Sequence, residues 1–248
     1  MSIKEYEKIK TRKYMKNLNL FIVLVHVLSL MFFTIVGKLD NSEGDYILQN
    51  ASGLTSLATT ITMSFTTIYV VYLMNKNFII RYIGKSRERI YLYPSGRDEI
   101  FKNKLFTSLS FLSKSFFSIV ILVNILFLFS SRIINISFNP RIVNISFTCE
   151  LIYNLVDIFA ISILALLVSI TMIILSTLFG IKFQSTNVSL ITSVGLVALL
   201  GNIVAETYNI SSIYIGLICA SMILINYLIS KYLLSYVFNI DIMNDNKL

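Results

Sequence analysis

Residues 151–179 read LIYNLVDIFAISILALLVSITMIILSTLF, a run of 29 residues whose only charged side chain is Asp157. As a helix, this run is long enough to cross the roughly 30 Å hydrocarbon core of a bilayer. The composition agrees, because the chain has a mean hydropathy of +0.76 and only 14% charged residues in 248. Soluble domains carry about 25% charged residues. The sequence therefore predicts a membrane protein.

Six apolar runs of this kind occur along the chain. They cover approximately residues 18–37, 53–74, 105–131, 151–179, 188–205 and 212–238. We therefore predict an all-α polytopic membrane protein of six transmembrane helices, with a single transmembrane domain over residues 1–248. The first run is longer than a signal-peptide core, and no small-residue cleavage site follows it, so we count it as a span.

The distribution of Lys and Arg predicts the orientation. The N-terminal tail holds six of them and segment 75–104 holds eight, whereas the segments on the opposite side together hold three. Since membrane proteins keep Lys and Arg on the cytoplasmic side, we expect both termini to be cytoplasmic. The net charge of +8 is explained in this way and does not indicate nucleic acid. The bias toward Ile, Asn, Lys and Tyr is typical of an AT-rich bacterial source, so we expect a multi-pass protein of a bacterial plasma membrane.

Three segments leave alternatives open. In the tail, Ile3, Tyr6 and Ile9 share one helical face among lysines, which indicates either an interfacial helix on the inner leaflet or a plain polybasic anchor. Segment 132–150 is either an external hairpin or a short interfacial helix. Within 188–238, three glycines interrupt the apolar pattern, so broken or re-entrant helices are an alternative to two simple spans.

The chain carries none of the enzyme signatures that we examined. His26 is the only histidine, so a zinc site of the HExxH type is excluded, and there is no GxSxG nucleophile motif. Gly84-Lys85-Ser86 resembles the end of a phosphate-binding loop, but Ile79 stands where that loop needs a glycine. We expect no catalytic site, metal or cofactor in this chain.

Polar side chains within the spans are the candidates for a translocation path. Lys114 and Asp157 lie inside the third and fourth spans, and in antiparallel neighbours they would come within reach of each other. They are either a gating ion pair or a structural one, with snorkelling as a further option for Lys114. His26 is either a hydrogen-bonded residue of the bundle or a proton relay.

Two hydroxyl stripes follow helical spacing. The second span has one face of Thr55, Thr59, Thr62 and Thr66, and the third has one of Thr107, Ser110, Lys114 and Ser118. Such stripes either line a translocation path or let helices pack closely and form hydrogen bonds.

Segment 75–104 is the largest cytoplasmic segment between spans, and it contains RERIYLYPSGRDEIFKNK at 87–104. Pro94, Ser95 and Gly96 favour a turn. Asp98 and Glu99 then suit the first turn of a helix that continues into the third span. This pattern fits either docking against another protein or a solvated loop on anionic lipid.

The run 89–104, RIYLYPSGRDEIFKNK, resembles the LYPxxRxxIxxxK stretch of permeases from bacterial type-two ABC exporters. In that family the stretch joins the second and third spans and contacts the ATPase subunit. The basic tail, the six spans and the closing YLLSYVFNIDIMN at 232–244 are also similar to this group. Size and composition look most like the small permeases of Gram-positive bacteria that export, or give immunity to, antimicrobial peptides and lantibiotics.

The resemblance implies a permease without an ATPase site, paired with itself or with a second permease. Two separate ATPase subunits would bind ATP and Mg²⁺. It implies export of peptides or amphipathic drugs, with the ATPase contact at Arg87, Arg89, Tyr93, Pro94 and Arg97. The alternatives are an ion-coupled secondary transporter and a membrane-embedded immunity or sensor scaffold.

Overall fold

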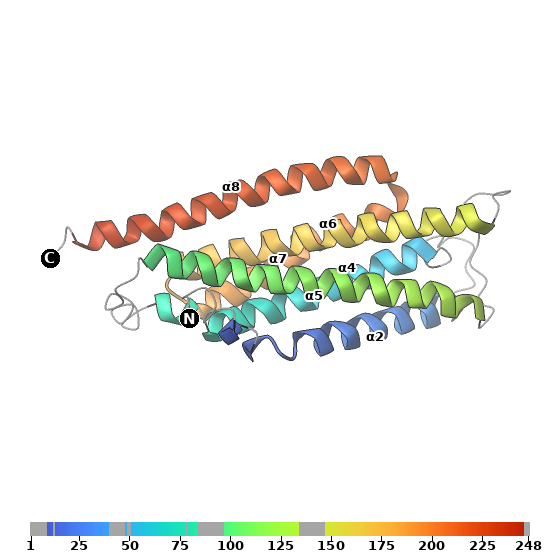
Figure 1. The fold of residues 1–248 in the computed structure, drawn as a ribbon, viewed down its shortest axis with the longest axis horizontal. Helices are drawn as coiled ribbons and strands as arrows, with labels where there is room; N and C mark the ends of the chain where they lie inside the picture. The colour runs from blue at the N-terminus through green and yellow to red at the C-terminus, as the bar shows by residue number, and fades with distance from the viewer. Residues whose placement is uncertain are drawn as a thin grey trace.

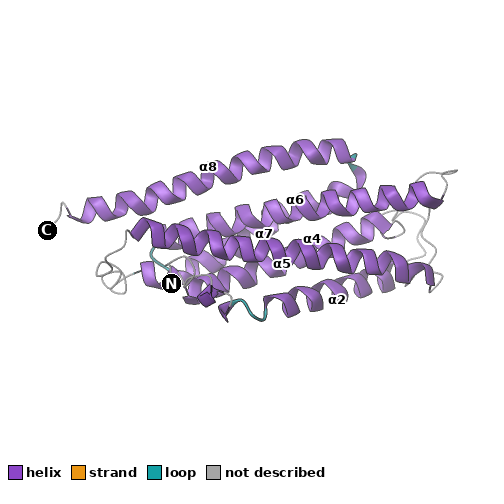
Figure 2. Ribbon diagram, viewed as in Figure 1, coloured by secondary structure: helices purple, strands orange, loops and turns teal. Residues whose placement is uncertain are grey.

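The computed structural model describes residues 9–11, 13–39, 48, 51–77, 79–83, 97–133 and 147–245. Every regular element within these residues is helical (Figure 2). The long helices are α2 (Leu18–Leu39), α4 (Ala51–Asn77), α5 (Arg97–Ile133), α6 (Phe147–Lys182), α7 (Thr186–Ala205) and α8 (Ser212–Asp245). Two single-turn 3₁₀ helices, η1 (Ile79–Tyr82) and η3 (Glu206–Asn209), follow α4 and α7.

All six long helices contain a stretch long and apolar enough to cross a membrane. The predicted class and the six predicted spans are thereby confirmed, and the chain is a multi-pass membrane protein by this criterion. α5 begins at Arg97, ahead of the apolar run 105–131, as predicted for a helix that continues into the third span. Asp98 and Glu99 therefore stand in its first turn, as expected from the favourable interaction of acidic groups with a helix N-terminus.

The helices form one elongated bundle (Figure 1). The start of α2, the start of α5 and the end of α8 lie at one end, which we call the basic end because most described cations lie there. α7 and α8 are each continuous, and η3 with Ile210 and Ser211 joins them. No re-entrant element is therefore formed within residues 186–245.

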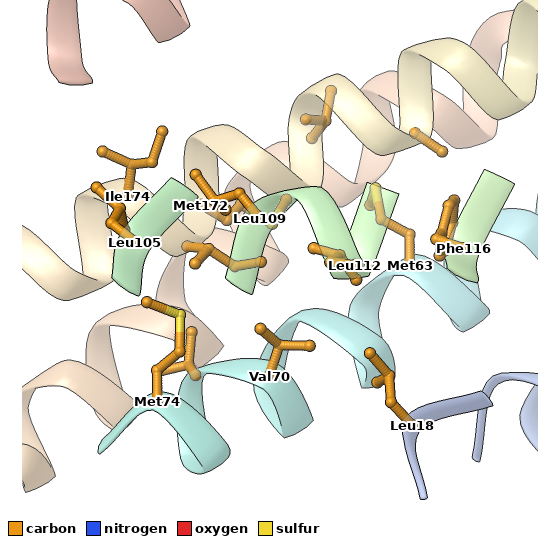
Figure 3. Close-up of a cluster of buried hydrophobic side chains, with 14 of the residues drawn as sticks. Leu18, Met63, Val70, Met74, Leu105, Leu109, Leu112, Phe116, Met172 and Ile174 are labelled. Carbon is orange, nitrogen blue, oxygen red and sulfur yellow. The ribbon is translucent and has the colours of Figure 1, made fainter. Parts of the chain in front are cut away.

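α4 and α6 form the centre of the bundle: α4 packs against α2, α6 and α7, and α6 also packs against α5 and α8. Figure 3 shows how the apolar side chains of α4 meet those of the neighbouring helices. The buried cluster includes Met63, Val70, Met74, Leu105, Leu109, Leu112, Phe116, Met172 and Ile174. α8 packs mainly against α6, and most of its surface is exposed.

The described part of the N-terminal tail is helical at residues 9–11 and 13–14. It buries Thr11 and Met15 against the bundle, while Ile9 remains 60% exposed. Of the predicted amphipathic face, Ile3 and Tyr6 lie outside the described residues. Segment 134–146 also lies outside them, so the choice between a hairpin and an interfacial helix stays a prediction.

Candidate functional site

The hydroxyl face predicted on α4 is buried inside the bundle. Thr55, Thr59, Thr62 and Thr66 are each at most 1% exposed. Thr55 donates a hydrogen bond to the carbonyl oxygen of Ala51 at 3.0 Å. This stripe therefore faces protein rather than lipid.

A second hydroxyl stripe, which we did not predict, lies on α6. Ser162, Ser169 and Ser176 recur every seven residues, and all three are fully buried. Gly180 lies on the same face of α6 and shows which helix this face meets. A Cβ atom at Gly180 would lie 2.7 Å from the Cβ of Ser189 on α7. The end of the serine stripe therefore faces α7 and also η1, whose Ile79 lies beside the same glycine. The seven-residue spacing of serines was the available sequence signal.

Six buried hydroxyl groups on α4, α6 and α7 have no hydrogen-bond partner among the described residues. We call this set the hydroxyl seam, and it comprises Thr59, Thr66, Thr67, Ser162, Ser176 and Ser189. A buried hydroxyl without a partner costs about 1–3 kcal/mol. Water or a polar ligand between the helices would supply the missing hydrogen bonds.

A polar triad joins α2, α4 and α5. The Nδ1 atom of His26 lies 2.8 Å from Oγ1 of Thr62, and its Nε2 atom lies 2.9 Å from Oδ1 of Asn124. Thr62 donates its own proton to the carbonyl oxygen of Ala58, so Nδ1 must be the donor toward Thr62. Nε2 is then a hydrogen-bond acceptor. Rotation of the Asn124 side-chain amide by 180° exchanges its oxygen and nitrogen and places an N–H donor against Nε2. With both ring nitrogens engaged, His26 serves as a hydrogen-bonded link between three helices.

A second polar contact holds α8 to the opposite face of α6. Thr171 lies 2.9 Å from Oδ1 of Asn226, and Nδ2 of Asn226 donates to the carbonyl oxygen of Leu167 at 3.0 Å. Asn226 is 8% exposed in a helix that is otherwise mostly exposed. This contact therefore fixes the position of α8 on the bundle.

The hydroxyl stripe predicted on α5 points away from the one on α4. Ser110, Lys114 and Ser118 are exposed, and Thr107 is half-buried. Helical spacing identifies a shared face but not its direction, so the sequence could not tell which of the two stripes is buried. Asp157 on α6 is half-buried, and Lys114 on α5 is exposed, so the predicted ion pair between them stays a prediction.

Most of the predicted ATPase contact lies outside the described residues. This applies to Arg87, Arg89, Tyr93 and Pro94, and of Arg97 only the backbone is described, as the first residue of α5.

The two ends of that charged loop are described, and they meet in the bundle. The rings of Tyr82 in η1 and Phe101 in α5 make an edge-to-face contact with centroids 5.1 Å apart. Phe101 and Ile79 are fully buried. The residues on either side of the loop are therefore held to each other and to the core, a feature that we did not predict.

Among the described residues, no group of three or more His, Cys, Asp or Glu side chains could hold a metal ion. Comparison of the chain with protein-family models, with curated proteins and with solved structures gave no match.

Proposed function

We propose that the chain is the permease subunit of an ATP-driven exporter of the type-two class. Separate ATPase subunits dock at the basic end, which faces the cytoplasm. The permease, as a homodimer or with a second permease, moves peptides or amphipathic drugs outward across a bacterial plasma membrane. The resemblance of residues 89–104 to the ATPase-contacting stretch of that family is the sequence basis of this proposal.

The observation that carries the proposal is that the residues at both ends of the charged loop pack against each other and against the bundle. Tyr82 and Phe101 hold its two ends together, and Ile79 inserts beside Gly180 of α6. A force on the loop is therefore transmitted to α4, α5 and α6 instead of being absorbed by flexible connections. A loop whose role was only to set topology would not need such an attachment.

The hydroxyl seam supplies the second half of the mechanism. ATP-driven movement of the loop shifts α4 relative to α6 and α7, and this shift exposes the unpartnered hydroxyls of the seam. They then bind water or the polar groups of the substrate, which offsets the loss of helix packing. Closure of the seam after release restores the packed bundle.

Co-purification tests the proposed ATPase contact. The chain carries an affinity tag and is co-expressed with an ATPase encoded next to its gene, if the genomic neighbourhood contains one. Tyr and Arg are the residue types that often dominate interface energies, so we expect Tyr93→Ala/Arg97→Ala to lose most of the bound ATPase. The control, Lys231→Ala/Tyr232→Ala, removes one cation and one tyrosine from exposed positions of α8 and should retain the ATPase.

Full retention of the ATPase by the loop variant would contradict the assigned contact. Transport in proteoliposomes by the chain alone, abolished by Asp157→Asn, would instead support an ion-coupled secondary transporter.

A further inference from the structure

A polar cavity lies at the basic end, between the N-terminal helical residues, α4 and α5. Its volume is about 30 Å³, and it is open to solvent on one side. The polar side chains that line it are Lys10, Thr11, Tyr14, Asn77, Lys104 and Ser108. Met15, Leu73 and Met74 form its apolar lining. We call it the headgroup cavity.

The polar lining suits an anion with several oxygen atoms. Lys10 and Lys104 contribute ammonium groups from two different elements of the chain, and lysine is a common binder of phosphate. Tyr14, Thr11 and Ser108 contribute hydroxyl groups, which donate to anionic oxygens. Thr11 is only 8% exposed, so at least one of these donors is set within the protein.

The cavity lies at the depth of the lipid headgroups. Lys114 is at the middle of the span Glu99–Ser130, which has 32 residues. Lys104 is ten residues nearer the basic end, or about 15 Å along the helix. That distance is about half of a 30 Å hydrocarbon core. The Lys104 side chain therefore starts at the boundary between acyl chains and headgroups.

The surroundings of the cavity are strongly basic. Among the described side chains of this end, Glu99 is the one carboxylate. The cations are Lys10, Lys13, Lys16, Lys76, Arg81, Lys102, Lys104, Lys182 and Lys231. Cationic groups at a cytoplasmic surface attract anionic lipids, and basic pockets between helices bind their headgroups.

From these observations we propose that the headgroup cavity binds the phosphate-bearing headgroup of an anionic phospholipid of the inner leaflet. The lipid would link the N-terminal helical residues to α4 and α5 by contacting Lys10 and Lys104 together. This inference rests on the proposed orientation of the chain but not on its ATPase partner.

Lipid binding is measured on the purified chain in detergent. Native mass spectrometry at increasing phosphatidylglycerol gives the dissociation constant of the tightest bound lipid, with phosphatidylcholine as the neutral comparison. We expect phosphatidylglycerol to bind more tightly. Each lysine contributes about fivefold in affinity, so Lys10→Gln/Lys104→Gln should weaken binding about thirtyfold. The control, Lys102→Gln/Lys182→Gln, removes the same charge from exposed positions at this end and should change binding less than about threefold.

Equal affinity in the wild type and the cavity variant would overturn the proposal, as would equal losses in both variants, because attraction would then be diffuse. A second experiment adds inorganic phosphate alone as a competitor of the bound lipid. If millimolar phosphate displaces the lipid completely, the cavity is a site for free phosphate, and the lipid assignment is wrong.

A second variant keeps the proposal testable if the double lysine variant does not fold. Tyr14→Phe/Ser108→Ala keeps both charges and removes two hydroxyl donors. We expect it to weaken phosphatidylglycerol binding about fivefold or more. If the double lysine variant does not fold, an unchanged affinity in this hydroxyl variant overturns the proposal.

Discussion

The contact between Gly180 of α6 and Ser189 of α7 predicts a large difference between two Gly→Ala substitutions. A Cβ atom at Gly180 would lie 2.7 Å from Cβ of Ser189 and 3.3 Å from its Oγ. Carbon atoms pack best about 3.5–4.0 Å apart, so Gly180→Ala must separate the two helices by about 1 Å. Overpacking of this kind costs about 1–3 kcal/mol.

Gly195 on α7 is the matched control, because no atom lies within 4 Å of the position that its Cβ would take. Alanine at an open helical position stabilises a helix by about 0.5–1 kcal/mol relative to glycine. Since both variants share this gain, we expect Gly180→Ala to be less stable than Gly195→Ala by about 1–3 kcal/mol.

Unfolding in mixed detergent and dodecyl sulfate micelles, followed by circular dichroism at 222 nm, measures this difference. Ser189→Gly removes the opposing Cβ. Gly180→Ala should therefore cost much less stability in the Ser189→Gly background than in the wild-type chain. Equal stability of Gly180→Ala and Gly195→Ala would refute the reasoning. Absence of any coupling between Gly180→Ala and Ser189→Gly would refute it as well.

Three other predictions concern the polar contacts. His26→Leu and Asn124→Leu should show a coupling energy of about 0.6–1.7 kcal/mol in a double-mutant cycle of unfolding, and additive effects would argue against the link. Asn226→Leu should raise hydrogen exchange in α8 while α6 stays protected; unchanged exchange would mean that apolar packing alone holds α8. Thr66→Val/Ser162→Ala removes two unpartnered hydroxyls, so stability should stay equal or rise by about 1 kcal/mol while ATP-driven transport falls. Unaltered transport in this variant would show that the hydroxyl seam is not part of the translocation path.

Sequence patterns were most informative about the helices themselves. The apolar runs located all six spans, because bilayer thickness sets a minimum length for them. The acidic residues after Gly96 marked the start of α5, since they favour a helix N-terminus. Both signals are local, and neither depends on which helices become neighbours.

The site depended on contacts between distant residues, and these were harder to predict. The Thr55–Thr66 face was recognised, but periodicity could not tell that it points inward while the Ser110–Ser118 face points outward. The partners of His26 come from helices 36 and 98 residues away along the chain. Single serines on α6 are weak signals in an apolar run, because serine is also common wherever membrane helices approach closely.

ATP-dependent transport by the reconstituted complex tests the proposed function most directly. Proteoliposomes would contain the chain with the ATPase subunit identified by co-purification, and a fluorescently labelled cationic amphipathic peptide would be the transported species. We expect the peptide to cross the membrane only when the ATPase and hydrolysable ATP are both present, and to stop crossing in Tyr93→Ala/Arg97→Ala. Equal transport without the ATPase, driven by a proton or sodium gradient, would contradict the proposal.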